Sequence, residues 1–433
     1  ELMTLPHVQC LSVLAMVNQQ HVTRVHTGVR RCSPAVSGQG LVQQSLTAVP
    51  SAMLRRKITH TDLEVSPCCL GGMTWGSQNT EVDASEQLSL AFDLGVNFID
   101  TAEGYPVPMA ADTQGLTDLA IAKWMKTSRQ PRNQVVISTK VCGYNDRYTW
   151  LRESGEGTRL TRAQIIESVE GSLRRLGVDE IDLLQLHWPD RQVNLTNQRA
   201  QRISGTPGQE RARGVVPYEE QVEAMDQLVR EGKVRYWGLS NENADGVLAF
   251  REAASQLAIC PPVVVQNAYS LLQRYDEHEL IPKSLEAGVQ KPCRPEIAYI
   301  AYSPLSAGVL SGKYAYAEAA EKAPRKSTKK RSRRLGLIKG YTDSFLQTQA
   351  PAAVSAYVQC ARKHGVTPSQ FAIAHCNSRR FICSTIVGAT SMSQLAENLV
   401  GFSVQWSQQM EDDVLEIYRK YPDPWRVQVA GGG

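Results

Sequence analysis

Residues 96–105 read V-N-F-I-D-T-A-E-G-Y, in which a short apolar run ends at Asp100 and Tyr105 follows. A similar arrangement recurs in V-V-I-S-T-K (135–140), I-D-L-L-Q-L-H (181–187) and V-R-Y-W-G-L-S-N (234–241). Each apolar run has the length of a buried parallel strand, and sequence typical of helices separates one run from the next. Polar groups at the C-terminal ends of successive parallel strands converge on one mouth. These segments therefore predict a barrel with a shared polar site.

Eight strands are expected from about Met53 onward. They are expected at Cys68–Gly72, Val96–Thr101, Val135–Val141, Ile181–Trp188, Val234–Ser240, Val263–Ala268, Ile297–Ser303 and Ser384–Gly388. Between them apolar residues recur at helical spacing, most clearly in Thr161–Leu176 and Tyr218–Arg230. This alternation predicts an α/β fold, a (β/α)8 TIM barrel preceded by a β-hairpin at Leu54–Val65. The lack of an early G-x-G-x-x-G argues against a doubly wound sheet.

The composition argues against several classes of protein. The chain has 433 residues, of which 42% are hydrophobic, and a formal net charge of +4. Near-balanced charge gives no global electrostatic support for nucleic-acid binding, and no run approaches the about eighteen apolar residues of a membrane span. The ten cysteines form no C-x-x-C pair and no zinc-type Cys/His motif. We therefore expect free thiols in a reducing compartment, with Cys68 and Cys69 buried, and no metal ion.

The N-terminal segment differs from the rest of the chain. Residues 2–61 contain no Asp or Glu, whereas arginines occur among Ser, Thr, Val and Gln. This composition is typical of an organellar transit peptide, and an ordinary disordered tail is the alternative. We expect residues 1–52 to be a transit peptide or disordered segment and residues 53–433 to form the barrel domain. The expected destination is the chloroplast stroma, with the mitochondrion or the cytoplasm as alternatives.

Asp100, Tyr105, Lys140 and His187 together indicate proton transfer. A phenol is a weak acid, with a reference pKa of about 10, and a nearby lysine cation helps it to lose its proton. Asp100 offers Lys140 a counter-charge, and the imidazole of His187 can orient a carbonyl group. Each residue alone has an ordinary structural explanation as a turn, a cap, a packing contact or a satisfied hydrogen bond. Their joint placement at successive strand ends favours catalysis.

These four residues resemble the Asp-Tyr-Lys-His tetrad of the aldo-keto reductases, in the contexts F-I-D-T-A-E-G-Y, V-V-I-S-T-K and D-L-L-Q-L-H-W-P. The resemblance covers about residues 53–420 and includes G-K-V-R-Y-W-G-L-S-N-E, V-V-V-Q-N-A-Y-S-L-L and I-V-G-A-T. It is greatest to the Tas-like branch and its plant plastid relatives, and potassium-channel β-subunits share much of the cofactor-binding sequence. It implies reduction of an aldehyde or ketone with NADPH, with Tyr105 as the proton donor.

The resemblance also implies which residues bind NADP(H). Those that match the nicotinamide end are Gly72, Met73, Asp100, Ser240, Asn241, Gln266 and Tyr302. Those that match the pyrophosphate segment are Ser303, Pro304, Leu305, Gly308 and Lys313. Those that match the adenosine segment are Arg334, Gly388, Thr390, Gln394, Glu397 and Asn398. Small residues let backbone amides approach a phosphate, and a lysine neutralises it.

Thr390 departs from the family pattern, because many members have an arginine there that binds the 2′-phosphate bidentately. NADPH preference then depends on the helix that begins near Ser391 and on the connection 314–341. The basic residues of this connection are Lys326, Lys329, Lys330, Arg331, Arg333 and Arg334. They have two interpretations, contact with a cofactor phosphate or solvated surface. His187 favours carbonyl reduction, because the steroid double-bond reductases of the family have glutamate at this position.

Two alternatives to a carbonyl reductase stay open. The channel-subunit resemblance allows an NADPH-binding regulatory or redox-sensing subunit with little turnover. Barrel architecture alone allows a Schiff-base aldolase that acts through Lys140. As partners we expect a small carbonyl substrate, no nucleic acid and no membrane, in a monomer or weak oligomer. The substrate is set by long connections after strands, such as 106–115 and 190–217, whose conformation periodicity does not reveal.

Overall fold

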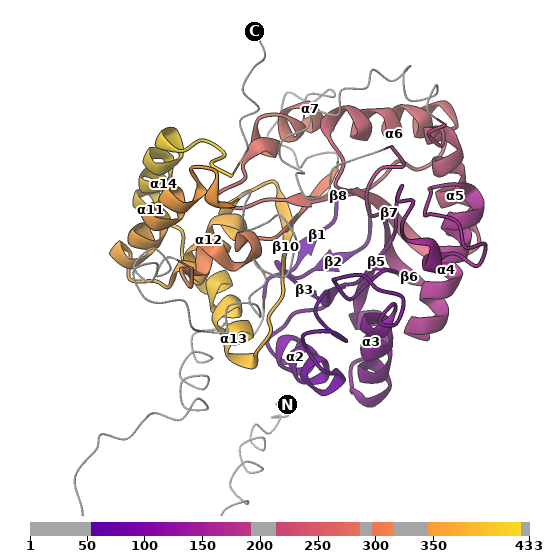
Figure 1. Cartoon of the computed structure of the whole chain (residues 1–433), viewed down its shortest axis with the longest axis horizontal. Helices are drawn as coiled ribbons and strands as arrows, with labels where there is room; N and C mark the ends of the chain where they lie inside the picture. Colours follow the sequence, from indigo (N-terminus) through magenta and orange to yellow (C-terminus); the bar gives the residue numbers. More distant parts are fainter. Residues whose placement is uncertain (1–52, 192–213, 286–296, 315–344, 426–433) are drawn as a thin grey trace, which may run out of the picture. The chain divides into compact units, whose positions relative to one another are not determined.

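The computed structural model describes residues 53–191, 214–285, 297–314 and 345–425, all within one compact unit, Gly38–Gly433. Eight parallel strands close a barrel in the order β10-β3-β4-β5-β6-β7-β8-β9 (Figure 1). The strands are β3 (Cys68–Gly71), β4 (Phe98–Asp100), β5 (Val136–Val141), β6 (Ile181–Leu186), β7 (Val234–Ser240), β8 (Val264–Ala268), β9 (Ala298–Tyr302) and β10 (Ile382–Val387). The predicted TIM barrel is confirmed, and every expected strand overlaps an observed one.

Burial on both faces explains why these short runs form strands. Every residue of β5 and β6 is buried, which is typical of parallel strands covered on both sides. The register pairs Asp100 of β4 with Ser138 of β5, and Lys140 of β5 with Gln185 of β6. The last residues of neighbouring strands therefore reach the same end of the barrel, where loops meet.

Helices surround the strands (Figure 1). They are α2 (Glu81–Asp93), α3 (Leu116–Thr127), α4 (Arg162–Leu176), α5 (Tyr218–Arg230), α6 (Ala244–Gln256), α7 (Leu280–Leu285), α11 (Ala350–Lys363), α12 (Pro368–Ser378), α13 (Met392–Val400) and α14 (Gln408–Lys420). The two helices predicted most clearly are confirmed as α4 and α5, and the Thr161 hydroxyl caps α4 by accepting from the N–H of Gln164. Between β9 and β10 the described chain contains two helices, α11 and α12, where simple alternation predicts one.

The predicted hairpin is present as β1 (Arg56–Lys57) and β2 (Glu64–Val65), which pair antiparallel. Ile58 of its turn packs with residues of the barrel strands in one buried cluster. Arg56 donates a hydrogen bond to the carbonyl oxygen of Ile382, the first residue of β10 (3.0 Å). The hairpin therefore covers the N-terminal ends of the strands, and the polar mouth lies at the opposite end.

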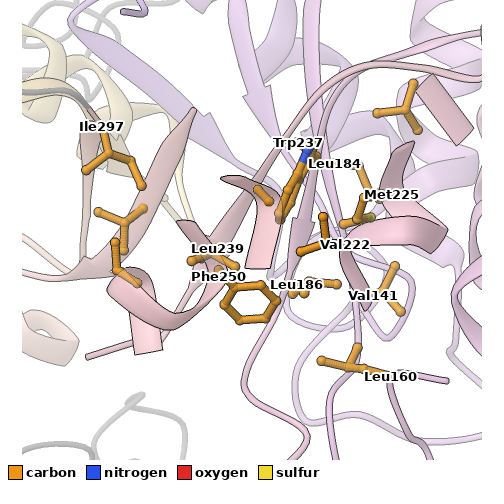
Figure 2. Packing of buried hydrophobic residues seen from close by; sticks show 14 of the residues in the cluster. Val141, Leu160, Leu184, Leu186, Val222, Met225, Trp237, Leu239, Phe250 and Ile297 are labelled. Carbon is orange, nitrogen blue, oxygen red and sulfur yellow. The ribbon is translucent and has the colours of Figure 1, made fainter. Parts of the chain in front are cut away.

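A buried cluster joins the strands to the helices outside them (Figure 2). Val222 and Met225 of α5 belong to it together with Leu184 of β6 and Trp237 of β7. Burying a side chain of this size stabilises the fold by about 1.5–3 kcal/mol. Packing of this kind holds the strand ends in fixed positions, which a site built from several strands requires.

Three other sequence expectations concern membrane spans, cysteines and the N-terminal segment. No helix in the described ranges is long and apolar enough to span a bilayer. The cysteines of these ranges are free thiols, and Cys68 and Cys69 are buried as predicted. Residues 1–52 lie outside the described residues, so the transit peptide and the boundary at residue 53 stay predictions.

Candidate active site

The four predicted catalytic residues come from three neighbouring strand ends. Asp100 is the last residue of β4, Lys140 is the last but one of β5, and His187 follows β6 directly. Tyr105 lies in the loop after β4, where its backbone N–H donates to the carbonyl oxygen of Ala102 (3.0 Å). Asp100, Tyr105 and Lys140 are each less than a tenth exposed (3%, 8% and 1%). The structure thus gathers the four side chains at one end of the barrel.

Lys140 forms a buried ion pair with Asp100. Its Nζ lies 2.6 Å from Asp100 Oδ2 and donates a second hydrogen bond to the carbonyl oxygen of Thr101 (2.8 Å). Burial would lower the pKa of Lys140, but the negative charge of Asp100, assisted by Tyr105, outweighs burial and raises the pKa above its ordinary value. Lys140 is therefore a fixed cation near neutral pH.

The ring of Tyr105 lies close to this cation and to an imidazole. Lys140 Nζ is 4.9 Å from the centroid of the ring. The ring centroid of His187 is 5.7 Å away, with the two planes at 74°. A cation this close to a phenol favours loss of the hydroxyl proton. The arrangement can therefore pass a proton from Tyr105 to a polar group held at the mouth.

His187 is fixed through its backbone, and its ring packs beside the rings of Tyr105 and Trp188. Its N–H donates to the carbonyl oxygen of Val141 (2.8 Å), and its own carbonyl oxygen accepts from Asn241 Nδ2 (2.8 Å). Burial, and then the charge of Lys140, lower the pKa of His187 well below its ordinary value. The imidazole is therefore neutral near pH 7, and its Nδ1 has no hydrogen-bond partner among the described residues. A neutral ring has one donor and one acceptor nitrogen.

Residues at the ends of β7, β8 and β9 form a second polar group beside the tetrad. Ser240 Oγ donates to the carbonyl oxygen of Gln266 (2.9 Å) and lies 3.3 Å from Asn241 Nδ2. Tyr302 donates its hydroxyl to Asn241 Oδ1 (2.5 Å). Gln266 Nε2 donates to Asp100 Oδ1 (2.9 Å), so this amide supports the ion pair as well as facing the mouth. Four predicted cofactor residues are thus brought together.

A buried ion pair beside the tetrad was not predicted from the sequence. Arg152 Nη1 and Nη2 lie 2.7 and 3.0 Å from the two carboxylate oxygens of Glu103. Glu103 Oε1 also accepts from the backbone N–H of Cys142 (2.6 Å), and the N–H of Glu103 donates to the carbonyl oxygen of Lys140 (3.1 Å). The pair therefore ties the loop that carries Tyr105 to the end of β5. Glu103 stands in the F-I-D-T-A-E-G-Y segment, which was a signal, but nothing in the sequence indicated its partner.

The comparisons with known proteins agree with this geometry. A sequence model of the aldo/keto reductase family matches residues 67–419. The chain belongs to the aldo/keto reductase family. It is 35% identical over 376 residues to the protein named tas of Escherichia coli, covering 86% of this chain and 99% of that protein. It is 35% identical over 304 residues to an aldo-keto reductase of Babesia bovis (68% and 99%). It is also 28% identical over 356 residues to a probable voltage-gated potassium channel subunit beta of Oryza sativa (81% and 92%).

In this aldo-keto reductase the segment after β9 has an unusual backbone. Ser303, Ser306 and Ala307 have positive φ angles of 58°, 46° and 57°, which residues other than glycine seldom adopt. Gly308, at 87°, continues the same turn without a steric cost. Strained backbone clusters where the chain approaches a ligand. This turn lies in the segment Ser303–Lys313 that was predicted to follow a cofactor pyrophosphate, and that role stays a prediction.

Gly72 directly follows β3, and local packing is enough to explain why a glycine stands there. The N–H of Gly72 donates to the carbonyl oxygen of Asp100 (2.9 Å). A Cβ atom at Gly72 would lie 2.7 Å from Thr117 Cγ2, so no larger residue fits. The carbonyl oxygen of Met73 accepts from the N–H of Val107 (2.9 Å), which ties this strand end to the loop after Tyr105.

The predicted adenosine segment is only partly assembled within the described residues. Thr390 donates from both its N–H and its hydroxyl to Gln394 Oε1 (3.1 Å each). Asn398 Nδ2 donates to the carbonyl oxygen of Gly388 (3.5 Å). Glu397 instead accepts from the hydroxyl of Thr367, the N-cap of α12 (2.7 Å), so it makes an interhelical contact. Arg334 and the basic residues before it lie outside the described residues.

Aromatic side chains continue outward from His187. Its ring centroid is 4.7 Å from that of Trp188. Tyr148 lies 6.3 Å from Trp188 and 5.4 Å from Trp150, measured between ring centroids. Trp188 is buried, whereas Trp150 is 37% exposed, so the row leads from the tetrad towards solvent. The row therefore packs aromatic side chains beside His187, and its outer member, Trp150, presents apolar surface to solvent.

Proposed function

We propose that this aldo-keto reductase reduces an aldehyde or a ketone to the alcohol with NADPH. When bound, NADPH supplies the hydride for the carbonyl carbon. Tyr105 gives its hydroxyl proton to the carbonyl oxygen, and Lys140 stabilises the phenolate that is left. Asp100 holds Lys140 in place, and neutral His187 hydrogen-bonds the carbonyl oxygen. The observation that carries the proposal is the position of the Tyr105 ring, with the Lys140 ammonium 4.9 Å from its centroid and the His187 ring centroid 5.7 Å away.

Several features of the mouth support NADPH as the cofactor. The positive φ angles from Ser303 to Gly308 suit a backbone that follows a pyrophosphate. The N-terminus of α13 begins just after Thr390, and a helix N-terminus favours a phosphate. Ser240 and Asn241 offer hydroxyl and amide groups to the nicotinamide carboxamide. We propose that NADPH is preferred to NADH, with additional help from the basic residues of 326–334.

The geometry disfavours a Schiff-base aldolase. A lysine that attacks a carbonyl must lose its proton, and enzymes achieve this by lowering its pKa. The pKa of Lys140 is raised instead, because the charge of Asp100 outweighs the effect of burial. Lys140 is therefore suited to be a fixed cation beside Tyr105.

A regulatory or redox-sensing subunit that binds NADPH with little turnover is the second candidate. It is supported by the 28–30% identity to proteins named voltage-gated potassium channel subunit beta. A panel of aliphatic and aromatic aldehydes and ketones would distinguish the two. A carbonyl reductase consumes NADPH over many turnovers with some members of the panel, whereas a sensor oxidises at most its bound equivalent slowly.

Replacing Tyr105 by phenylalanine tests the proposed proton donor. Loss of the hydroxyl should lower turnover by about 10²–10⁴-fold, because general acid catalysis contributes that much. The dissociation constant for NADPH, measured by fluorescence titration, should stay within about threefold of the wild-type value, since a hydroxyl alone is removed. Tyr236→Phe is the matched control, because Tyr236 bonds to Asp62 beside the hairpin at the other end of the barrel. Near-full activity of Tyr105→Phe would refute the assignment.

A further inference from the structure

Three chemically different side chains meet where α11 packs against α14, side by side in Figure 1. Cys360 and His364 lie four positions apart at the end of α11, so they share one face of the helix. Asp413 belongs to α14. The thiol sulfur, an imidazole nitrogen and a carboxylate oxygen all lie within 4.8 Å of one another. The sequence did not predict this cluster, because 49 positions separate His364 from Asp413.

Contacts around the cluster orient its donor atoms. His364 Nε2 lies 2.7 Å from Asp413 Oδ2. The imidazole stacks on Phe371, with ring centroids 6.1 Å apart and planes at 12°, which fixes its direction. The side chains of His364 and Asp413 are 11% and 14% exposed. An ion can therefore reach the cluster from solvent and still be largely enclosed once bound.

The donor set matches zinc better than the common oxygen-seeking ions. Mg²⁺ and Ca²⁺ prefer oxygen ligands only, whereas thiolate and imidazole favour Zn²⁺. Zn–S bonds of about 2.3 Å and Zn–N or Zn–O bonds of about 2.0–2.2 Å place neighbouring donors roughly 3–4 Å apart. The three donor atoms, within 4.8 Å of one another, already lie near these separations. We propose that Cys360, His364 and Asp413 bind one Zn²⁺ that clamps α11 to α14, with water as the fourth ligand.

A neighbouring lysine competes with the ion. Lys363 Nζ contacts the two oxygens of Asp413 at 2.9 and 2.7 Å. Its side chain is 60% exposed, so the ammonium can turn into solvent when an ion arrives. Burial, together with the charge of Asp413, raises the pKa of Cys360 to about 11. As the Zn–S bond forms, the S–H bond of Cys360 breaks and its proton passes to solvent. The clamp does not depend on the function proposed for the barrel mouth.

Cobalt substitution tests the site directly on the full chain, reduced and freed of metal with a chelator. One equivalent of Co²⁺ should give the visible absorption of tetrahedral cobalt and a thiolate-to-cobalt band, and Zn²⁺ should abolish both. Cys360→Ser should remove the thiolate band and weaken binding beyond the roughly 10–100-fold that loss of a supporting residue costs. Cys260→Ser is the matched control, because Cys260 is an exposed free thiol outside the cluster.

A second variant guards against simple damage to the fold. Lys363→Met removes the competing ammonium and should tighten zinc binding by roughly two- to fivefold, the scale of an exposed ion pair. Zinc should also raise the melting temperature of the wild type and of Lys363→Met, but not that of His364→Gln. The proposal is overturned if no tetrahedral spectrum forms, if the spectrum survives Cys360→Ser, or if Lys363→Met binds zinc more weakly.

Discussion

Replacing Arg152 by methionine would leave the Glu103 carboxylate buried without its cation. Both side chains of the pair are at most 3% exposed. After the substitution the carboxylate keeps the N–H of Cys142 at 2.6 Å as a donor but loses two charged hydrogen bonds. Breaking a buried pair by removing one partner costs about 3–5 kcal/mol. We therefore expect Arg152→Met to lower the free energy of unfolding by that amount, a large share of the roughly 5–15 kcal/mol typical of folded proteins.

The assay is urea unfolding at pH 7, followed by tryptophan fluorescence, in a double-mutant cycle. Glu103→Gln removes the charge but leaves an amide oxygen that can accept from the N–H of Cys142. In the Glu103→Gln/Arg152→Met double variant no buried charge is left unpaired. The free energy of unfolding of the double variant should therefore be about 1–3 kcal/mol higher than the value expected if the losses of the two single variants were added.

An exposed pair with a similar N–O distance provides the control. Arg162 Nη2 lies 2.8 Å from Glu223 Oε2, but these side chains are 42% and 45% exposed. Arg162→Met should cost at most about 1 kcal/mol, because water solvates the carboxylate that remains. If Arg152→Met costs no more than Arg162→Met, or if the losses in the cycle simply add, the argument from burial is wrong.

Three other predictions follow from separate parts of the chain. Burial, and then the charges of Arg379 and Arg274, lower the pKa of His375 well below its ordinary value. The neutral form of His375 therefore supports full stability above about pH 6.5, and acidification below that pH lowers the free energy of unfolding by up to about 1.4 kcal/mol per pH unit. In His375→Leu, a plot of the free energy of unfolding against pH should be flatter below about pH 6.5 than in the wild type. Thr390→Arg should tighten NADPH binding about tenfold or more by adding a charged hydrogen bond to the 2′-phosphate, while fluorescence titration shows NADH unchanged. Deleting residues 1–52 should leave the melting temperature and the NADPH affinity unchanged but abolish import of a fluorescent fusion protein into plastids. If the fusion of the full chain stays in the cytosol, the transit-peptide prediction is wrong.

Strand positions followed from the sequence where both faces of a strand are buried. The run expected at Val135–Val141 is observed as Val136–Val141, because a short segment buried on both faces suits a parallel strand even where it contains Ser138, Thr139 and Lys140. The last strand was predicted at Ser384–Gly388 but is observed at Ile382–Val387, so its predicted start is two residues late and its predicted end one residue late. Its pairing with β9 is irregular between Ile382 and Ser384, and such irregularities leave no mark in apolar periodicity.

The tetrad could be located from the sequence because each member follows an apolar run whose end is fixed by barrel geometry. Contacts between residues far apart in the chain could not be located in this way. Arg152 meets Glu103 across 49 positions, and Gln266 of β8 meets Asp100 of β4 across 166. Such pairs depend on how distant segments pack in the folded barrel, which local sequence patterns do not reveal. The Cys360–His364–Asp413 cluster was missed for the same reason.

Because two of the four tetrad residues are buried charges, the four residues differ in how well they distinguish an enzyme from a non-catalytic sensor. Asp100 and Lys140 are paired with almost no exposure, so losing either would leave an unpaired buried charge. A member of this family that had lost turnover would still need both for stability, and their presence alone does not distinguish an enzyme from a sensor. Tyr105 and His187 are different, because a phenol and a neutral imidazole can be replaced by uncharged side chains without leaving a charge unpaired. That this chain has both, with their ring centroids 5.7 Å apart beside the cation, is therefore the stronger argument for carbonyl reduction.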